Sequence, residues 1–202
     1  MKNSLISVAT VIALSSFGFA GGDIEPVEPV VGTPMVEASA GNAYVGLGFA
    51  LVSTRDSSVS LDFFSDSDGQ DRLGNIAFLA GYNFNSYIGV EGRYSTGVSN
   101  SDIVSMDGWS LFLKPQYPVS DIFNIYALLG YGGVTMDPEN NSRVNVDDTG
   151  FQWGIGADYA VTEQVSIFVD YTSLASDMDG VYANGALTVD ADALTIGVTY
   201  AF

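Results

Sequence analysis

The chain has 202 residues and is strongly acidic, with 24 aspartates and glutamates against 6 lysines and arginines and a formal net charge of −18. Such a chain has no basic patch with which to bind a nucleic-acid backbone, and it contains neither cysteine nor histidine. Thiolate and histidine metal sites, histidine general bases and Ser-His-Asp triads are therefore excluded. We expect no nucleic-acid partner, no cofactor and no specific metal site.

The first twenty residues have the layout of a secretory signal peptide. Lys2 gives a short basic start, an apolar stretch runs from Leu5 to Leu14, and small residues lead up to Ala20. This order of regions is typical of export signals, so we predict a signal peptide over residues 1–20. The alternative is a buried core segment. A secreted chain without cysteine suits a Gram-negative envelope.

Residues 21–42 are rich in proline and acid. The prolines are Pro26, Pro29 and Pro34, and the acids are Asp23, Glu25, Glu28 and Glu37. Prolines and mutually repelling charges favour an extended chain that packs poorly. We predict a tether that lies in the periplasm ahead of the folded domain.

From residue 43 onward, large apolar side chains alternate with small or polar ones, the period of two that is typical of β-strands. We predict strands over residues 43–54, 72–84, 87–97, 108–118, 124–136, 149–161, 165–175 and 194–202. The strand over 124–136 cannot be phased, because Leu128, Leu129 and the glycines after them allow either face outward. Pro115 lies on the apolar side of its strand, where its missing N–H requires a bulge or local unpairing.

The connections favour an up-and-down barrel in a membrane. Turns of about two to five residues alternate with loops of about ten to seventeen, as short periplasmic turns and long extracellular loops do in outer-membrane barrels. Hydrophobic residues make up 47% of the chain, yet no run of about 20 apolar residues is present to form a transmembrane helix. We predict an all-β, eight-stranded antiparallel transmembrane barrel over residues 43–202.

A soluble lipocalin-like barrel would show the same alternation, with its apolar side chains inside. Its solvent-facing side would carry Lys, Glu and Arg, whereas the minor face here is mostly Gly, Ala, Ser, Thr and Asn. Small side chains suit the narrow lumen of an eight-stranded barrel. Aromatic residues at the predicted strand ends resemble interfacial girdles: Tyr44, Phe84, Tyr87, Tyr117, Tyr126 and Phe202 at one end, and Trp109, Phe151 and Tyr171 at the other.

The last predicted strand carries large apolar side chains at alternate positions, namely Leu194, Ile196, Val198, Tyr200 and Phe202. This ending, together with the segments 81–84, 89–94 and 126–132, resembles the small eight-stranded outer-membrane barrels of the OmpA/OmpX type, which belong to the porin family. The resemblance implies that the barrel-assembly machinery reads the last strand as an insertion signal. It also implies contact with outer-membrane lipid and lipopolysaccharide. We expect a monomer.

The predicted inward face carries a small set of charged and amide side chains: Glu91, Arg93, Lys114, Gln116, Gln152, Asp158 and Asp170. Charges inside a membrane protein are costly unless they are paired or hydrated, so we expect a network of salt bridges and water. The network could be a polar plug that fixes the lumen. It could also be a gate whose ion pairs rearrange, or a catalytic centre with a carboxylate and a lysine as acid and base.

Most of the acidic residues fall in the predicted loops. Asp66, Asp68 and Asp71 hint at a calcium loop, but Phe64 stands at the first ligand position and no glutamate at the twelfth. We expect a solvated acidic surface, with weak divalent-cation binding that bridges to lipopolysaccharide phosphates as the hypothesis. Two apolar pairs, Phe63-Phe64 and Val181-Tyr182, either fold back on the barrel rim or form an exposed contact surface.

Together these features favour a non-enzymatic protein of the cell outer membrane. Its role would be structural or one of surface interaction, with acidic loops outside the cell. Acyl-transferring and protease barrels use a histidine, as the resemblance to that broader class implies, and this chain has none. The alternative is a narrow porin-like channel for ions or small solutes, gated by lumenal ion pairs.

Overall fold

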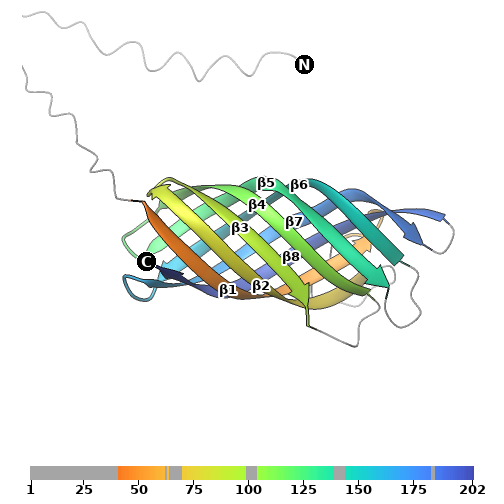
Figure 1. Cartoon of the computed structure of the whole chain (residues 1–202), viewed down its shortest axis with the longest axis horizontal. Helices are drawn as coiled ribbons and strands as arrows, with labels where there is room; N and C mark the ends of the chain where they lie inside the picture. Colours follow the sequence, from red (N-terminus) through yellow and green to blue (C-terminus); the bar gives the residue numbers. More distant parts are fainter. Residues whose placement is uncertain (1–40, 62, 64–69, 99–103, 139–143, 183–184) are drawn as a thin grey trace, which may run out of the picture. The chain divides into compact units, whose positions relative to one another are not determined.

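The computed structural model describes residues 41–61, 63, 70–98, 104–138, 144–182 and 185–202. These residues form a closed antiparallel β-barrel (Figure 1). Its strands are β1 (Asn42–Asp56), β2 (Gln70–Asn85), β3 (Ile88–Gly97), β4 (Val104–Pro118), β5 (Phe123–Pro138), β6 (Val144–Ala160), β7 (Val165–Tyr182) and β8 (Gly185–Ala201). Each strand pairs with its neighbours in sequence, and β1 closes the barrel on β8, with Val45 opposite Tyr200. The predicted fold is confirmed.

The predicted signal peptide over residues 1–20 lies outside the described residues, as does nearly all of the predicted tether over 21–42. Asn42, which the sequence analysis assigns to the tether, is instead the first residue of β1. Within the described ranges, no helix is long and apolar enough to cross a membrane.

The central part of the wall presents large apolar side chains to the outside. Leu111 and Phe151 are each 63% exposed, and Ile155 and Ile196 are 59% and 58% exposed. On the same strands the inward positions are small, polar or buried, since successive side chains of a strand point to opposite faces. This part of the barrel is therefore apolar on the outside and carries its charged side chains inside, the reverse of a lipocalin-like barrel and the arrangement of a membrane barrel.

The polarity reverses near one end of the barrel, which we call the loop end because residues 57–69, 98–103, 139–143 and 183–184 connect the strands there. On β8, Asp190 and Asp192 lie on the outward face with Leu194, where Arg55 pairs with both, and the inward face carries the buried residues Val189, Ala191 and Ala193. Apolar side chains thus face outward from Leu194 onward and inward before it. This switch marks the edge of the apolar outer belt.

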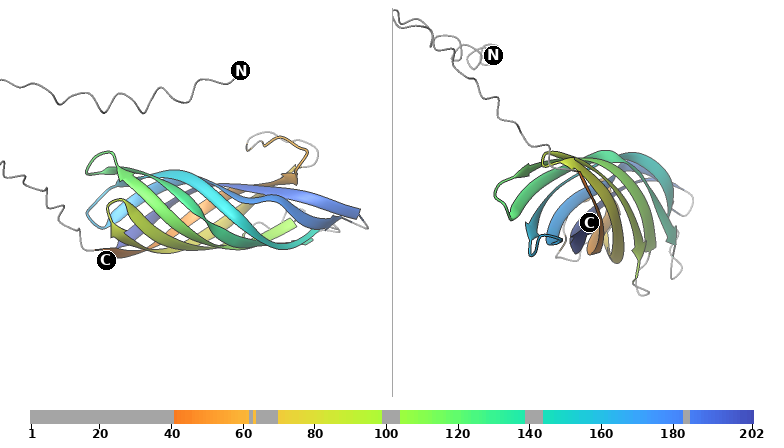
Figure 2. Two further views of the ribbon diagram at one scale, coloured as in Figure 1. Left: turned by 90° about the horizontal axis from the view of Figure 1, so that it is seen from above. Right: turned by 60° about the vertical axis from the view of Figure 1, so that its left-hand side comes forward.

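The strands run further toward the loop end than the sequence analysis predicts. β7 continues to Tyr182 and β8 begins at Gly185, so residues 183–184 alone connect them; Figures 1 and 2 show both strands reaching past their neighbours. The predicted strict alternation of long loops and short turns is wrong at this connection. Acidic residues there alternate with buried apolar ones. A prediction that requires large apolar residues on the outer face therefore ends these strands at the edge of the apolar belt.

The other end, which we call the turn end, carries the connections 86–87, 119–122 and 161–164. Near it the β4–β5 ladder pairs Leu113 with Leu129 and Gln116 with Tyr126 but leaves Lys114 and Pro115 unpaired. This is the local unpairing predicted at Pro115, without a change of register. A second interruption lies toward the loop end, where β6 and β7 pair at Val146–Gly180 and again at Trp153–Ser173.

The phase of β5, open in the sequence analysis, is set by packing. Leu129 and Tyr131 are exposed, whereas Leu128 is fully buried against Phe112 inside the barrel. The inward glycines pass close to the neighbouring strand: a Cβ on Gly130 would lie 2.0 Å from the Leu111 carbonyl oxygen. Only glycine therefore fits at that position, and its missing side chain is why the sequence pattern gives no phase there.

Candidate functional site in the barrel lumen

The lumen contains three successive layers of side chains, which we name here. The amide chain, nearest the turn end, consists of Asn42, Asn83, Gln116, Asn124 and Asp158. The ion cluster consists of Tyr44, Glu91, Arg93, Lys114, Tyr126, Asp170 and Thr172. The apolar plug, at the loop end, consists of Ala50, Val52, Leu73, Met106, Val134, Met136, Val146, Ala175, Met178, Val189, Ala191 and Ala193.

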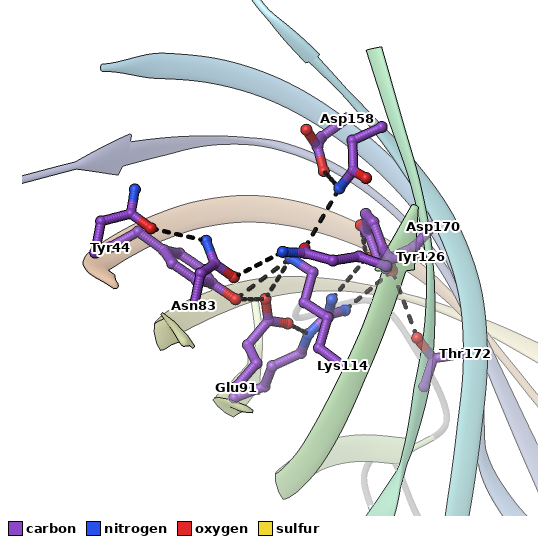
Figure 3. A network of polar contacts seen from close by, with 12 residues as sticks. Tyr44, Asn83, Glu91, Lys114, Tyr126, Asp158, Asp170 and Thr172 are labelled. Carbon is purple, nitrogen blue, oxygen red and sulfur yellow. Dashed lines mark hydrogen bonds and ion pairs between the residues drawn. The ribbon is translucent and has the colours of Figure 1, made fainter. Parts of the chain in front are cut away.

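Arg93 is the centre of the ion cluster, because it bonds to both Glu91 and Asp170, which Figure 3 labels. Its Nε donates to Glu91 Oε1 at 2.6 Å, and its two terminal nitrogens donate to Asp170 Oδ1 and Oδ2 at 3.0 and 2.7 Å. Glu91 lies two residues away on the same face of β3, whereas Asp170 reaches Arg93 from β7. Because a guanidinium presents a planar fork of donors, Arg93 can hold two carboxylates at once.

Lys114 forms the second half of the cluster. Its Nζ donates to Glu91 Oε2 at 3.2 Å and to the Tyr44 hydroxyl at 3.3 Å. The same ammonium lies 4.9 Å from the ring centroid of Tyr44 and 4.2 Å from that of Tyr126, within range of cation–π attraction. The Tyr44 hydroxyl donates to Glu91, and the Tyr126 hydroxyl donates to Asp170 at 2.8 Å.

The ion cluster is buried and balanced in charge. Arg93 and Lys114 each have 8% of the side chain exposed, and Glu91 and Asp170 have 1% and 0%. Two positive and two negative groups therefore compensate one another without solvent. Desolvated charges are tolerated when geometry and further hydrogen bonds compensate them, and the two tyrosine hydroxyls and Thr172 supply those bonds here.

The amide chain joins side chains of β1, β2, β4, β5 and β6, and Figure 3 labels two of its members, Asn83 and Asp158. The Asn83 amide donates to Asn42 at 3.2 Å, and the Gln116 amide donates to Asn83 at 3.3 Å. The Asn124 amide donates to both Gln116 Oε1 at 3.3 Å and Asp158 Oδ2 at 3.0 Å. The chain ends at Asp158, which makes no ion pair with any described residue.

The structure thus separates the seven residues predicted to share a lumenal network. Glu91, Arg93, Lys114 and Asp170 meet in the ion cluster, whereas Gln116 and Asp158 belong to the amide chain. Gln152 lies apart, toward the loop end, where its Nε2 donates to the Leu174 carbonyl at 2.8 Å. That contact bridges the interrupted part of the β6–β7 ladder.

Two members of the ion cluster were placed elsewhere by the sequence analysis. Tyr44 and Tyr126, predicted for an interfacial girdle, are each only 5% exposed and point into the lumen. Tyr44 could have been found from phase, because it shares a face with Gly46 and Gly48, opposite Val45 and Leu47. The inward position of Tyr126 could not be predicted, because the pattern of its strand does not show which face points outward.

The apolar plug has no counterpart in the sequence analysis. Its largest members, Met106, Met136 and Met178, are 0%, 1% and 4% exposed and come from β4, β5 and β7. Methionine is flexible enough to fill an irregular space. The Asn75 amide donates to the Met106 carbonyl at 2.8 Å, beyond Ser95–Gly108, the last pair of the β3–β4 ladder. A packed apolar layer therefore closes the loop end of the lumen.

Outside the wall, a second polar group lies near the loop end. Arg55 pairs with Asp192 and, at 3.2 Å, with Asp190, and the Tyr171 hydroxyl also donates to Asp192. The Phe63 ring contacts the Tyr171 ring edge-on at 6.3 Å between centroids. Phe63 thus lies back against the barrel, one of its two predicted positions. Phe64 and the side chains of Val181 and Tyr182 are outside the described residues.

The remaining predicted sites are placed only in part. Asp66 and Asp68 lie outside the described residues, and Asp71 is on β2, so weak cation binding by these acids stays a prediction. In the described ranges, no group of three or more acidic residues could hold a metal ion. In the predicted insertion signal, Ile196, Val198, Tyr200 and Phe202 are exposed on the outer face, and Leu194 is half-buried.

Comparison with known proteins agrees with this geometry. Residues 29–202 match the model of a family described as outer membrane protein beta-barrel domain. Outer membrane protein A of Serratia marcescens is 31% identical over 147 residues, which cover 66% of this chain and 40% of that protein. The virulence membrane protein PagC of Salmonella typhimurium is 29% identical over 115 residues, 52% of this chain and 57% of PagC.

A similar solved structure is that of Ail, the attachment invasion locus protein of Yersinia pestis, in complex with the heparin analogue sucrose octasulfate. It has 18% sequence identity and a TM-score of 0.55, and the match covers 81% of this chain and 99% of Ail. At this identity the likeness shows the fold. The chain spans 40% and 57% of the two relatives named above, so their activities do not transfer with the match.

Proposed function

The chain belongs to the family of outer-membrane protein β-barrel domains, and from this premise we propose that it is non-enzymatic, with a structural or surface-interaction role in the envelope. The observation that carries the proposal is the closed lumen. The ion cluster and the apolar plug lie in series, and both are buried. An ion that crossed the plug would lose its hydration without gaining polar partners, which is prohibitive in an apolar layer.

The loop end supplies the surface for such a role. Asp107, Asp147, Asp177 and Asp179 are exposed on strand segments beyond the apolar belt. We propose that this end lies outside the cell, with the turn end in the periplasm, as in barrels of this kind. The acidic rim would then meet lipopolysaccharide phosphates through divalent cations. Its charge makes a sulfated polyanion, such as the one bound to Ail, an unsuitable ligand for this chain.

A cysteine-labelling experiment tests the location and the orientation together. Because the chain has no cysteine, Ser60→Cys at the loop end and Asp121→Cys at the turn end each introduce a single thiol at an exposed position. On intact Gram-negative cells, a membrane-impermeant maleimide should label Ser60→Cys and leave Asp121→Cys unlabelled until the outer membrane is permeabilised. The opposite pattern would reverse the orientation, and labelling of neither after permeabilisation would contradict an envelope location.

The second candidate function is a narrow channel gated by the ion pairs. One observation favours it: Arg93 bonds to both Glu91 and Asp170, so it could exchange partners without becoming unpaired. Such an exchange would open the ion cluster but not the apolar plug, which contains no ion pair. A channel therefore also requires a movement of the apolar plug. For this reason we favour the closed barrel over the gated channel.

A further inference from the structure

A polar cavity of about 180 Å³ lies inside the turn end, between the amide chain and the turn over residues 161–164. We call it the vestibule; its lining includes Asn42, Asn124, Asp158, Glu163, Ser166 and Thr199. At about 30 Å³ for each water of the liquid, it offers room for roughly six waters or one small organic molecule. Neither the closed lumen nor the proposed surface role uses this space.

The charges around the vestibule are not balanced. Lys114 reaches its lining, but the Lys114 ammonium is already held by Glu91 and the rings of Tyr44 and Tyr126. Asp158 has no such partner: within the described part of the chain its carboxylate accepts one hydrogen bond, from Asn124 at 3.0 Å, and no ion pair. Glu163 adds a second negative group from the turn. The vestibule therefore carries excess negative charge.

The hydrogen-bonding groups of the vestibule point to the same kind of ligand. Asn124 uses its amide nitrogen for Gln116 and Asp158, which leaves its Oδ1 buried without a partner. Asp158 Oδ1 likewise accepts no hydrogen bond from a described residue. Only Asp158 thus offers a free acceptor to the vestibule, because Asn124 Oδ1 is shielded from it. A charged acceptor that faces a polar cavity favours a ligand that donates hydrogen bonds and carries positive charge.

We propose that the vestibule is a binding site for a small organic cation with a primary ammonium group. An ammonium carries three donors and a positive charge, and it can bond to the free Oδ1 of Asp158, with the charge of Glu163 nearby. Its alkyl part would lie toward the open mouth, with the hydroxyls of Ser166 and Thr199 beside it. The inference does not rest on the proposed function or on the orientation of the barrel.

Nitrogen-15 NMR of the refolded chain in a non-ionic detergent tests this directly. Titration with n-propylammonium chloride should shift the Asn124 side-chain amide and the Asp158 backbone amide saturably, with a Kd on the order of millimolar for so small a ligand. 1-Propanol, which has the same chain length without the charge, should not shift them. Equal or non-saturating shifts with both probes would mean that the vestibule holds only water, and would overturn the proposal.

Variants locate the binding. Asp158→Asn should weaken n-propylammonium binding at least about tenfold, because it removes the charged acceptor. Asp121→Asn, an equal change of charge on an exposed turn at the same end, should leave the Kd within about twofold. Glu163→Gln, at an exposed turn position that is safe for folding, should weaken binding two- to threefold, about the effect of one screened rim charge. Unchanged binding in Asp158→Asn would contradict the proposal.

Discussion

Replacing Arg93 by alanine is expected to lower the free energy of unfolding by about 3–5 kcal/mol, the range for breaking a buried ion pair. The reason is that Arg93 is the shared cation of Glu91 and Asp170, whose side chains are 1% and 0% exposed. Without it, two buried carboxylates face a lumen with one remaining cation, Lys114. Urea titration of the barrel in lipid vesicles, followed by heat-modifiable gel mobility, measures the loss.

The control for this prediction removes all four charges at once. Glu91→Gln, Arg93→Met, Lys114→Met and Asp170→Asn in one chain should destabilise the barrel much less than Arg93→Ala alone, because no charge is left uncompensated. Arg93→Lys should fall between them, since lysine cannot bond both Asp170 oxygens in the fork geometry. An Arg93→Ala barrel within 1 kcal/mol of the wild type would show that the cluster does not hold the lumen together.

The second large effect is expected in the apolar plug. Met136→Ala should cost about 2–5 kcal/mol, because it leaves a cavity in a layer where Met136 is 1% exposed and packs with Met106 and Val134. Met136→Leu keeps the volume and should cost less than about 1.5 kcal/mol. The same urea titration gives both values.

Leu111→Ala is the matched control for the plug, since Leu111 is a large apolar residue that is 63% exposed on the outer wall. Its truncation leaves no internal cavity and should cost no more than about 1 kcal/mol. If Met136→Ala were as mild as Leu111→Ala, the loop end of the lumen would not be tightly packed. The claim that it is sealed would then lose its basis.

The membrane-spanning part of the fold could be predicted because the alternation of large apolar with small or polar side chains continues through it. On β6, Phe151, Trp153 and Ile155 face outward and Gly154 inward, as their alternation requires. The same period of two places Glu91, Arg93, Lys114 and Asp170 inside. It does not say which of them pair, because pairing depends on the tilt and register of strands that lie opposite each other across the barrel.

The plug could not be predicted, for a physical reason visible on β8. Before Leu194, the inward positions are Val189, Ala191 and Ala193, and the outward ones are Asp190 and Asp192. Beyond the apolar belt the outer face carries acids, which are exposed on β7 and paired with Arg55 on β8, and the apolar side chains face inward. A prediction that requires apolar residues on the outer face therefore assigns these acidic strand segments to loops. It does not recognise that the methionines among them are buried in the lumen.

The central claim is that the lumen is closed, and single-channel recording tests it most directly. The refolded chain, with insertion verified by heat-modifiable mobility, is reconstituted in planar bilayers beside Lys114→Met, which loses one cation of the ion cluster. We expect both proteins to give silent bilayers, because the apolar plug blocks the lumen whatever the state of the ion pairs. Steady conductance steps in the wild type that change in Lys114→Met would contradict the closed barrel and establish the gated channel instead.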